Sequence, residues 1–83
     1  MKNVRSPDFR KLFEHLPQDI QRLTTEKYAL WKSNPRHPSL HFKPVGKYWS
    51  VRITREYRAL GVRSGETSIW FWIGPHSDDN KIV

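Results

Sequence analysis

Hydrophobic residues recur at helical spacing near the start of the chain, which predicts a first helix. Ser6, Pro7 and Asp8 supply an N-cap, a proline suited to the first helical position and an acid in the first turn. The apolar face that follows consists of Phe9, Leu12, Phe13 and Leu16. We therefore expect a helix that begins just after Ser6.

Pro17 interrupts this pattern, and a second apolar stripe follows it. Proline is also accepted at the start of a new helix, so we expect the second helix to begin there. Its apolar positions are Ile20, Leu23, Leu30 and Trp31. Asn34-Pro35 and His37-Pro38 should end it, because a residue before proline is driven out of the helical region. The two segments together predict a helical hairpin.

After residue 39 the hydrophobic period changes to two, which predicts β-strands. Trp49, Val51 and Ile53 alternate with polar residues, so that strand should bury one face. Further strands are expected at residues 57–63 and 69–73, after connections at 54–56 and 64–65, and a short edge strand at 40–43.

The strand at residues 69–73 is apolar on both sides, with Ile69, Phe71 and Ile73 facing one way and Trp70 and Trp72 the other. An interior or covered strand is expected there. The fold class that follows is α+β, with an N-terminal helical hairpin packed on a three- to four-stranded antiparallel sheet. A chain of 83 residues is expected to form one domain, residues 1–83.

The composition restricts the compartment and the chemistry. The chain has no cysteine, so it offers neither disulfides nor thiolate metal ligands, as suits a reducing cytoplasm. No stretch approaches the roughly 20 apolar residues of a membrane span, and residues 1–8 lack the apolar run of an export signal. We expect a cytoplasmic protein with no membrane partner, no cofactor and no metal.

Positive charge is concentrated in one part of the chain. The formal net charge is +7, and residues 36–63 alone carry seven bases against one acid, a sum of +6. Such a field favours encounter with nucleic acid or with an acidic protein. The alternative is that these residues only keep a small domain in solution. The bases are Arg36, Lys43, Lys47, Arg52, Arg55, Arg58 and Arg63.

The order of these segments resembles the RelE/ParE superfamily of toxin–antitoxin systems, over residues 9–76. The resemblance is carried by "FRKLFEHLPQDIQRL", "NPRHPSLHFKPV", "YWSVRITREYRALGV" and "IWFWIGPH". It implies a sheet with a helical hairpin on one side. Many members begin with an additional strand, but residues 1–5 are too short and polar to predict one.

The resemblance implies two different activities. RelE-like members bind the ribosome and cut mRNA, whereas ParE-like members inhibit DNA gyrase and are not nucleases; an antitoxin neutralises both. The nucleases use no metal, because the RNA 2′-hydroxyl attacks the phosphate while basic side chains stabilise charge and protonate the leaving oxygen. The catalytic positions it implies here are Arg58, Arg52 and His76. Lys43, Lys47, Arg55 and Arg63 are the candidate RNA-binding residues.

These roles suit the side chains, although each has an alternative. Arg58 is permanently charged and fork-shaped, so it can stabilise a phosphate but is a poor base; it could instead pair with Glu56 or an antitoxin acid. His76 could transfer protons, since imidazole titrates near about pH 6.5, or be only a loop residue. Trp70 and Trp72 could stack on bases, but a core or antitoxin contact is favoured.

One position departs from the family pattern. Close relatives have a tyrosine three residues after the basic residue of the last strand, whereas here Asp79 follows His76 at that spacing. A carboxylate would repel phosphate and, when ionised, cannot donate a proton. We therefore expect weak cleavage, or none, with binding retained, unless Asp79 only points to solvent.

The leading hypothesis is a RelE-like toxin of a type II system that binds the ribosome and mRNA, with metal-independent endoribonuclease activity favoured but left open. The alternative is a ParE-type inhibitor or a degenerate toxin that acts by protein binding. A plain nucleic-acid-binding module is a third class. The expected partners are an acidic antitoxin, the ribosome and mRNA, with the protein either monomeric or bound to its antitoxin.

Overall fold

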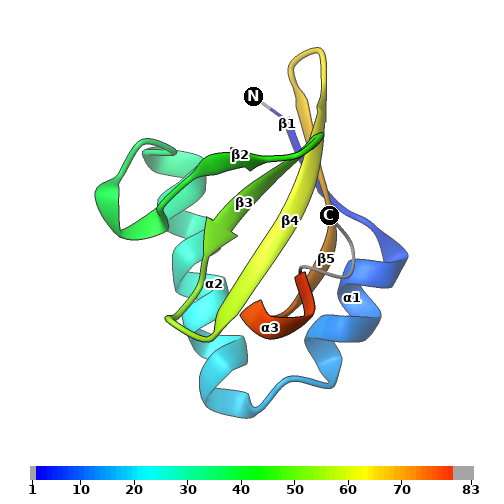
Figure 1. The fold of residues 1–83 in the computed structure, drawn as a ribbon, viewed down its shortest axis with the longest axis vertical. Helices are drawn as coiled ribbons and strands as arrows, with labels where there is room; N and C mark the ends of the chain where they lie inside the picture. Colours follow the sequence, from blue (N-terminus) through cyan, green and yellow to red (C-terminus); the bar gives the residue numbers. More distant parts are fainter. Residues whose placement is uncertain (1, 80–83) are drawn as a thin grey trace.

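The computed structural model describes residues 2–79, which form a five-stranded mixed sheet with two helices on one side (Figure 1). The strand order is β1-β5-β4-β3-β2. The elements are β1 (Lys2–Arg5), α1 (Pro7–Glu14), α2 (Gln18–Ser33), a 3-10 helix η1 (Pro38–Leu40), β2 (Lys43–Val45), β3 (Tyr48–Arg52), β4 (Tyr57–Ser64), β5 (Thr67–Pro75) and α3 (His76–Asp79). The expected α+β class is confirmed.

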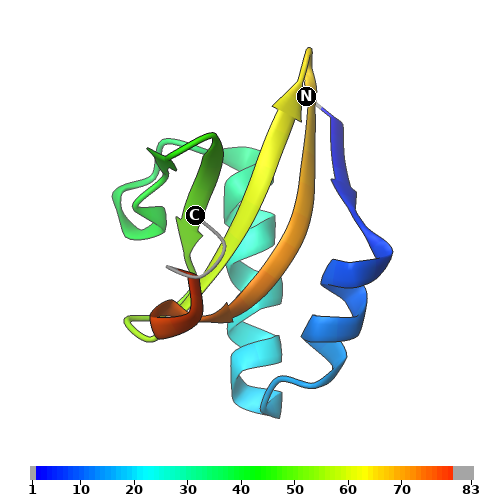
Figure 2. The same ribbon diagram turned by 45° about the vertical axis from the view of Figure 1, so that its right-hand side comes forward.

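Local capping explains where the two long helices begin and end. The Ser6 side chain accepts a hydrogen bond from the backbone N–H of Phe9 at 3.2 Å, which caps α1 as predicted. Pro17 is the N-cap residue of α2, and Asn34 is its C-cap just before Pro35. Figure 2 shows both helices on the same side of the sheet, joined at one end and separating toward the other.

The prediction for residues 1–5 is wrong, because residues 2–5 form a strand. β1 pairs in parallel with β5, with Val4 opposite Ile69 and Arg5 opposite Trp70. The side chain of Asn3 also accepts a hydrogen bond from Nε1 of Trp31 on α2 at 2.7 Å. The sheet therefore has five strands rather than three or four, and one of its pairs is parallel rather than antiparallel.

The predicted edge strand begins three residues further along the chain. Residues 38–40 form the short 3-10 helix, and His41 then adopts a left-handed conformation with φ 45°. The backbone becomes extended only at Lys43, where β2 pairs with β3. The prediction was right about an edge strand and wrong about its position.

A β-bulge changes which residues of β5 share a face. Leu60 pairs with Trp72 and Gly61 pairs with Trp70, so Phe71 is the additional residue. As a result Trp70 and Ile73 both join the core on the helix side, although simple alternation predicts opposite faces for them. Trp72, which pairs with Leu60 of β4, faces the other side of the sheet, as Leu60 does.

The main core lies between the sheet and the two helices. It consists of Phe9, Trp31, Leu40, Val51, Ile53, Ala59, Trp70 and Ile73. The opposite side of the sheet, which we call the outer face, carries α3 at one end. Strand alternation and register place Lys43, Ser50, Leu60 and Trp72 in one row across this face, and Arg52, Arg58 and Gly74 in the next. Within the described residues, no helix has the length and apolar character needed to cross a membrane.

Candidate nucleic-acid interface

Two arginines lie side by side near one end of the outer face. Arg52 of β3 is directly opposite Arg58 of β4 in the antiparallel ladder, and both are half-buried. The tight connection between the strands holds this register, since Oγ1 of Thr54 accepts hydrogen bonds from the N–H groups of Glu56 and Tyr57. Like charges directly opposite each other are unfavourable across two strands. An anion bound between them would remove that cost.

Two buried polar groups on the outer face have no hydrogen-bond partner. They are Nε of Arg58 and Oγ of Ser50, and Ser50 itself is 0% exposed. Each such group costs about 1–3 kcal/mol when left unsatisfied. An N–H and an O–H on the same face are both donors to an anionic oxygen. Among the described residues no carboxylate forms an ion pair with Arg58, so the expected alternative of a pair with Glu56 does not occur.

His41 supports the position of Arg52 and was not predicted as a functional residue. Its Nε2 lies 3.2 Å from Nη1 of Arg52, so the imidazole accepts a hydrogen bond from the guanidinium. The left-handed backbone of His41, at the end of η1, brings the ring to this position. Non-glycine residues adopt that conformation rarely, and nothing in the local sequence signals it.

His76 lies at the end of the sheet that carries the two arginines. It follows Pro75, which pairs with Tyr57, and its backbone N–H donates to the carbonyl of Glu56 at 2.6 Å. The residue begins α3 rather than a loop, and its side chain is exposed. A proton-transfer role for His76 stays a prediction. Asp79 is the last residue of α3, and its side chain lies outside what the structure describes.

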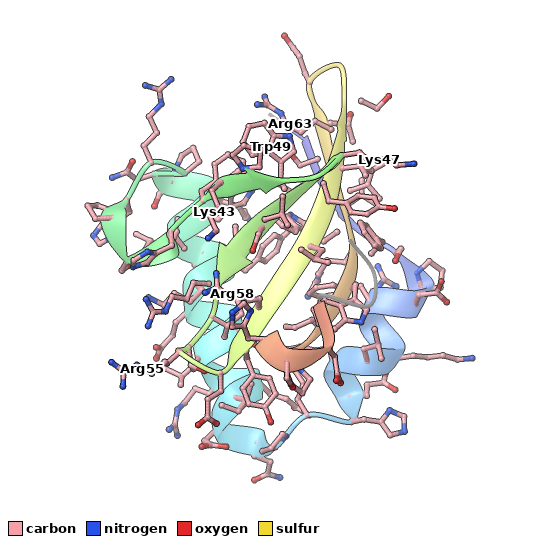
Figure 3. All side chains as sticks on the ribbon, in the orientation of Figure 1. Lys43, Lys47, Trp49, Arg55, Arg58 and Arg63 are labelled. Atoms are coloured by element: carbon pink, nitrogen blue, oxygen red, sulfur yellow. The ribbon has the colours of Figure 1, made fainter. Side chains whose placement is uncertain are left out.

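The four candidate RNA-binding residues do not form one cluster. Lys43 lies on the outer face, in the row next to Arg52 and Arg58 (Figure 3). Lys47 and Arg55 lie in turns at opposite ends of the sheet. Arg63 lines a shallow depression on the helix side together with Trp31 and Trp49. The structure therefore brings together Lys43, Arg52 and Arg58, and not the whole set.

Aromatic side chains also lie on the outer face. The rings of Tyr48 and Phe71 are 5.0 Å apart. Trp72 is half-buried and lies so close over Gly74 that a Cβ there would meet its ring at 2.8 Å. Trp70, in contrast, is only 5% exposed and belongs to the core, as favoured for that residue. Trp72 is therefore the aromatic surface in the row next to the arginines, whereas Tyr48 lies at the other end of β3 from Arg52.

The described residues contain no group of three or more histidine, cysteine or acidic side chains arranged to hold a metal ion. The chemistry available at the outer face comes from guanidinium, ammonium, imidazole and hydroxyl groups. Such groups bind an anion and stabilise negative charge that develops on it.

Solved structures of toxins have the same fold. A YoeB/ParE toxin from Agrobacterium tumefaciens is 21% identical over 92% of this chain and 99% of its own, with a TM-score of 0.71. A chain of the RelB–RelE antitoxin–toxin complex from Methanococcus jannaschii is 19% identical over 95% and 96%, also with a TM-score of 0.71. YafQ from E. coli is 13% identical over 92% and 93%, with the same score.

The sequence itself matches no protein-family model and no curated protein. The solved structures nevertheless share the helical hairpin and sheet over nearly their whole length. The chain therefore has the fold of the RelE-like toxins, which include RelE, YoeB, YafQ and ParE-like proteins, and the resemblance seen in the sequence is confirmed at the level of the fold.

Proposed function

We propose that this protein is the toxin of a type II toxin–antitoxin pair and that it acts in the cytoplasm by binding RNA at the ribosome through its outer face. The observation that carries the proposal is the pair Arg52 and Arg58, opposed across β3 and β4 with the Nε of Arg58 buried and unpartnered. Lys43 adds a third cation to the same face, and the unpartnered hydroxyl of Ser50, its strand partner, is buried beside it.

The chemistry of these groups is that of phosphate recognition. A guanidinium remains charged and offers several N–H donors, so Arg58 would hold phosphate oxygens and stabilise additional negative charge on them. Arg52, fixed by His41, would fill the neighbouring position. His76 is the candidate for proton transfer to the leaving oxygen. Trp72 and Tyr48, which are half-buried on the same face, would contact bases.

An antitoxin partner is part of the proposal. Structures with this fold include antitoxin–toxin complexes from Methanococcus jannaschii and Mycobacterium tuberculosis. Unpaired positive charge on the outer face suits an acidic antitoxin segment, which would occupy the surface that RNA otherwise uses. The protein would then be free or bound to its antitoxin.

Expression in bacteria tests this proposal. Induced alone, the protein should stop growth with protein synthesis falling first, and Arg58→Ala should restore growth because the anion site loses its central charge. Pulse labelling with a radioactive amino acid and with thymidine separates the two processes. Arg10→Ala, which removes an exposed arginine of α1, is the matched control and should remain as toxic as the parent.

The same experiment distinguishes the alternative inhibitor. If thymidine incorporation stops first while protein synthesis continues, the protein acts as a ParE-type inhibitor and the ribosomal proposal is wrong. If Arg58→Ala is as toxic as the parent although it is equally abundant and folded, the outer face is not the site of action.

A further inference from the structure

A row of apolar side chains crosses the outer face at the end away from the two arginines. All five strands contribute to it, and strand alternation and register place its members on one face: Val45 of β2, Tyr48 of β3, Val62 of β4, Ile69 of β5 and Val4 of β1. Val4 is 41% exposed and the other four are half-buried. We call this set the apolar row.

Two aromatic rings meet at the apolar row. The ring centroids of Tyr48 and Phe71 lie 5.0 Å apart, and Phe71 is the additional residue of the bulge in β5. Neither ring belongs to the main core or to the partly buried side chains packed against it, and both are half-buried. The pair therefore presents aromatic surface on the same side of the sheet as the arginines.

The charges on this side favour a polyanion that also carries flat apolar groups. The row that holds Arg52 and Arg58 and the row that holds Lys43 contain no acidic residue, and the apolar row has no charged residue at all. A single-stranded nucleic acid suits this arrangement, because its phosphates contact the cations while its bases stack on aromatic rings. An acidic protein segment with apolar side chains would need apolar contact there but no aromatic ring.

The spacing along the strands fits a nucleic-acid strand that runs parallel to them. Tyr48 precedes Arg52 by four residues in β3, so the two lie about 13 Å apart along the strand. Trp72 stands in the row between them. An extended single strand covers this distance in about two nucleotides, and successive bases can stack on successive aromatic side chains.

We propose that Tyr48 and Phe71 form a base-stacking subsite for RNA, about two nucleotides from the phosphate held by Arg52 and Arg58. The inference rests on the proposed binding of RNA by the outer face. Because the apolar row holds no cation, the subsite adds affinity without adding a phosphate contact. Its contribution is therefore independent of salt, unlike that of the arginines.

Two uncleavable 2′-O-methyl RNAs of about eight nucleotides test the subsite, one with bases and one with the same backbone but no bases. Fluorescence anisotropy should show that the parent prefers the base-bearing RNA about tenfold or more. Tyr48→Leu keeps an apolar side chain but removes the ring, so it should reduce this preference about fivefold or more and leave the salt dependence unchanged. Tyr48→Phe keeps the ring and should retain the preference within about twofold.

Arg58→Ala separates this subsite from the proposed function, because it should weaken both RNAs alike. If neither RNA binds the parent, the proposed RNA binding and the subsite are both wrong. If Arg58→Ala weakens both RNAs while Tyr48→Leu keeps the full base preference, only the subsite is wrong, and the apolar row is left as a surface for a partner protein. A change in salt dependence in Tyr48→Leu would also overturn the subsite.

A photocrosslink tests the same contact without any substitution. The RNA carries 5-iodouridine at every position, and irradiation of its complex with the parent protein joins the base to an aromatic side chain stacked on it. Mass spectrometry should locate a crosslink on Tyr48 or Phe71. Crosslinks that include neither residue would overturn the proposal.

Discussion

Gly61 of β4 lies against Trp70 of β5 with no room for a side chain of its own. A Cβ at this position would lie 2.8 Å from Cε3 of Trp70 and 3.0 Å from the backbone oxygen of Ile69. Trp70 is fixed in turn by its edge-on contact with Trp31, with ring centroids 5.4 Å apart. An additional methyl group would therefore force the core apart instead of filling space.

Gly61→Ala should accordingly reduce the free energy of unfolding by about 1–3 kcal/mol, as overpacking does in well-packed cores. Urea unfolding followed by tryptophan fluorescence measures the change. Ser64→Ala, at an exposed position of the same strand, should change it by less than about 0.5 kcal/mol. Equal stability of Gly61→Ala and the parent would mean that Trp70 does not pack against this strand as described.

The sequence was sufficient to place Arg52 and Arg58 together. Two strands that leave a tight connection centred on residue 55, as predicted at 54–56, must pair residues at equal distance from it, so 52 and 58 oppose each other. Arg63 could also have been assigned to the helix side of the sheet. It lies five residues from Arg58 in one continuous strand, and residues an odd number of positions apart face opposite sides. The position of His41 could not have been predicted, since it depends on a positive φ and no glycine in the sequence indicates one there.

Among the secondary-structure elements, those with local signals were predicted well. The start of α1, the start of α2 and its end are set by Ser6, Pro17 and Asn34, which act within one turn of the helix. β1 depends instead on partners distant in the chain, namely β5 and Trp31. The bulge at Phe71 likewise results from pairing with β4. Neither leaves a periodic pattern in its own segment.

Asp79, which stands where close relatives have a tyrosine, is the last residue of the short helix α3. It begins at His76, contacts β4 and β5, and lies at the end of the outer face that holds Arg58. A tyrosine at position 79 would add a phenol that can donate a proton, and an aspartate removes it. We expect the parent protein to cut ribosome-bound mRNA weakly or not at all, and Asp79→Tyr to cut it faster by about tenfold or more.

Primer extension on mRNA held in stalled ribosomes measures this difference. Asp78→Tyr introduces the same side chain one position earlier and serves as the control, with no expected gain. Fast cleavage by the parent that Asp79→Tyr leaves unchanged would show that Asp79 is not a defect.

On the scale of the whole molecule, the two sides of the sheet differ in character. The helix side holds the main core, whereas the outer face presents Arg52, Arg58 and Lys43 with unpartnered donors beneath them. The high positive charge of residues 36–63 is divided between this face, the turns and the helix side. Total charge therefore overstates how many cations can contact one ligand, and three is the number supported by geometry.

The salt dependence of RNA binding tests that central claim most directly. For three phosphate contacts on a single strand, the affinity of an uncleavable 2′-O-methyl RNA should fall about twentyfold between roughly 50 and 200 mM salt. Arg58→Ala should bind more weakly at low salt and lose only about sevenfold over that interval, because one contact is gone. Lys47→Ala, in the turn at the opposite end of the sheet from the two arginines, should follow the parent. A parent affinity that does not change with salt, or an Arg58→Ala slope equal to that of the parent, would contradict phosphate binding by the outer face.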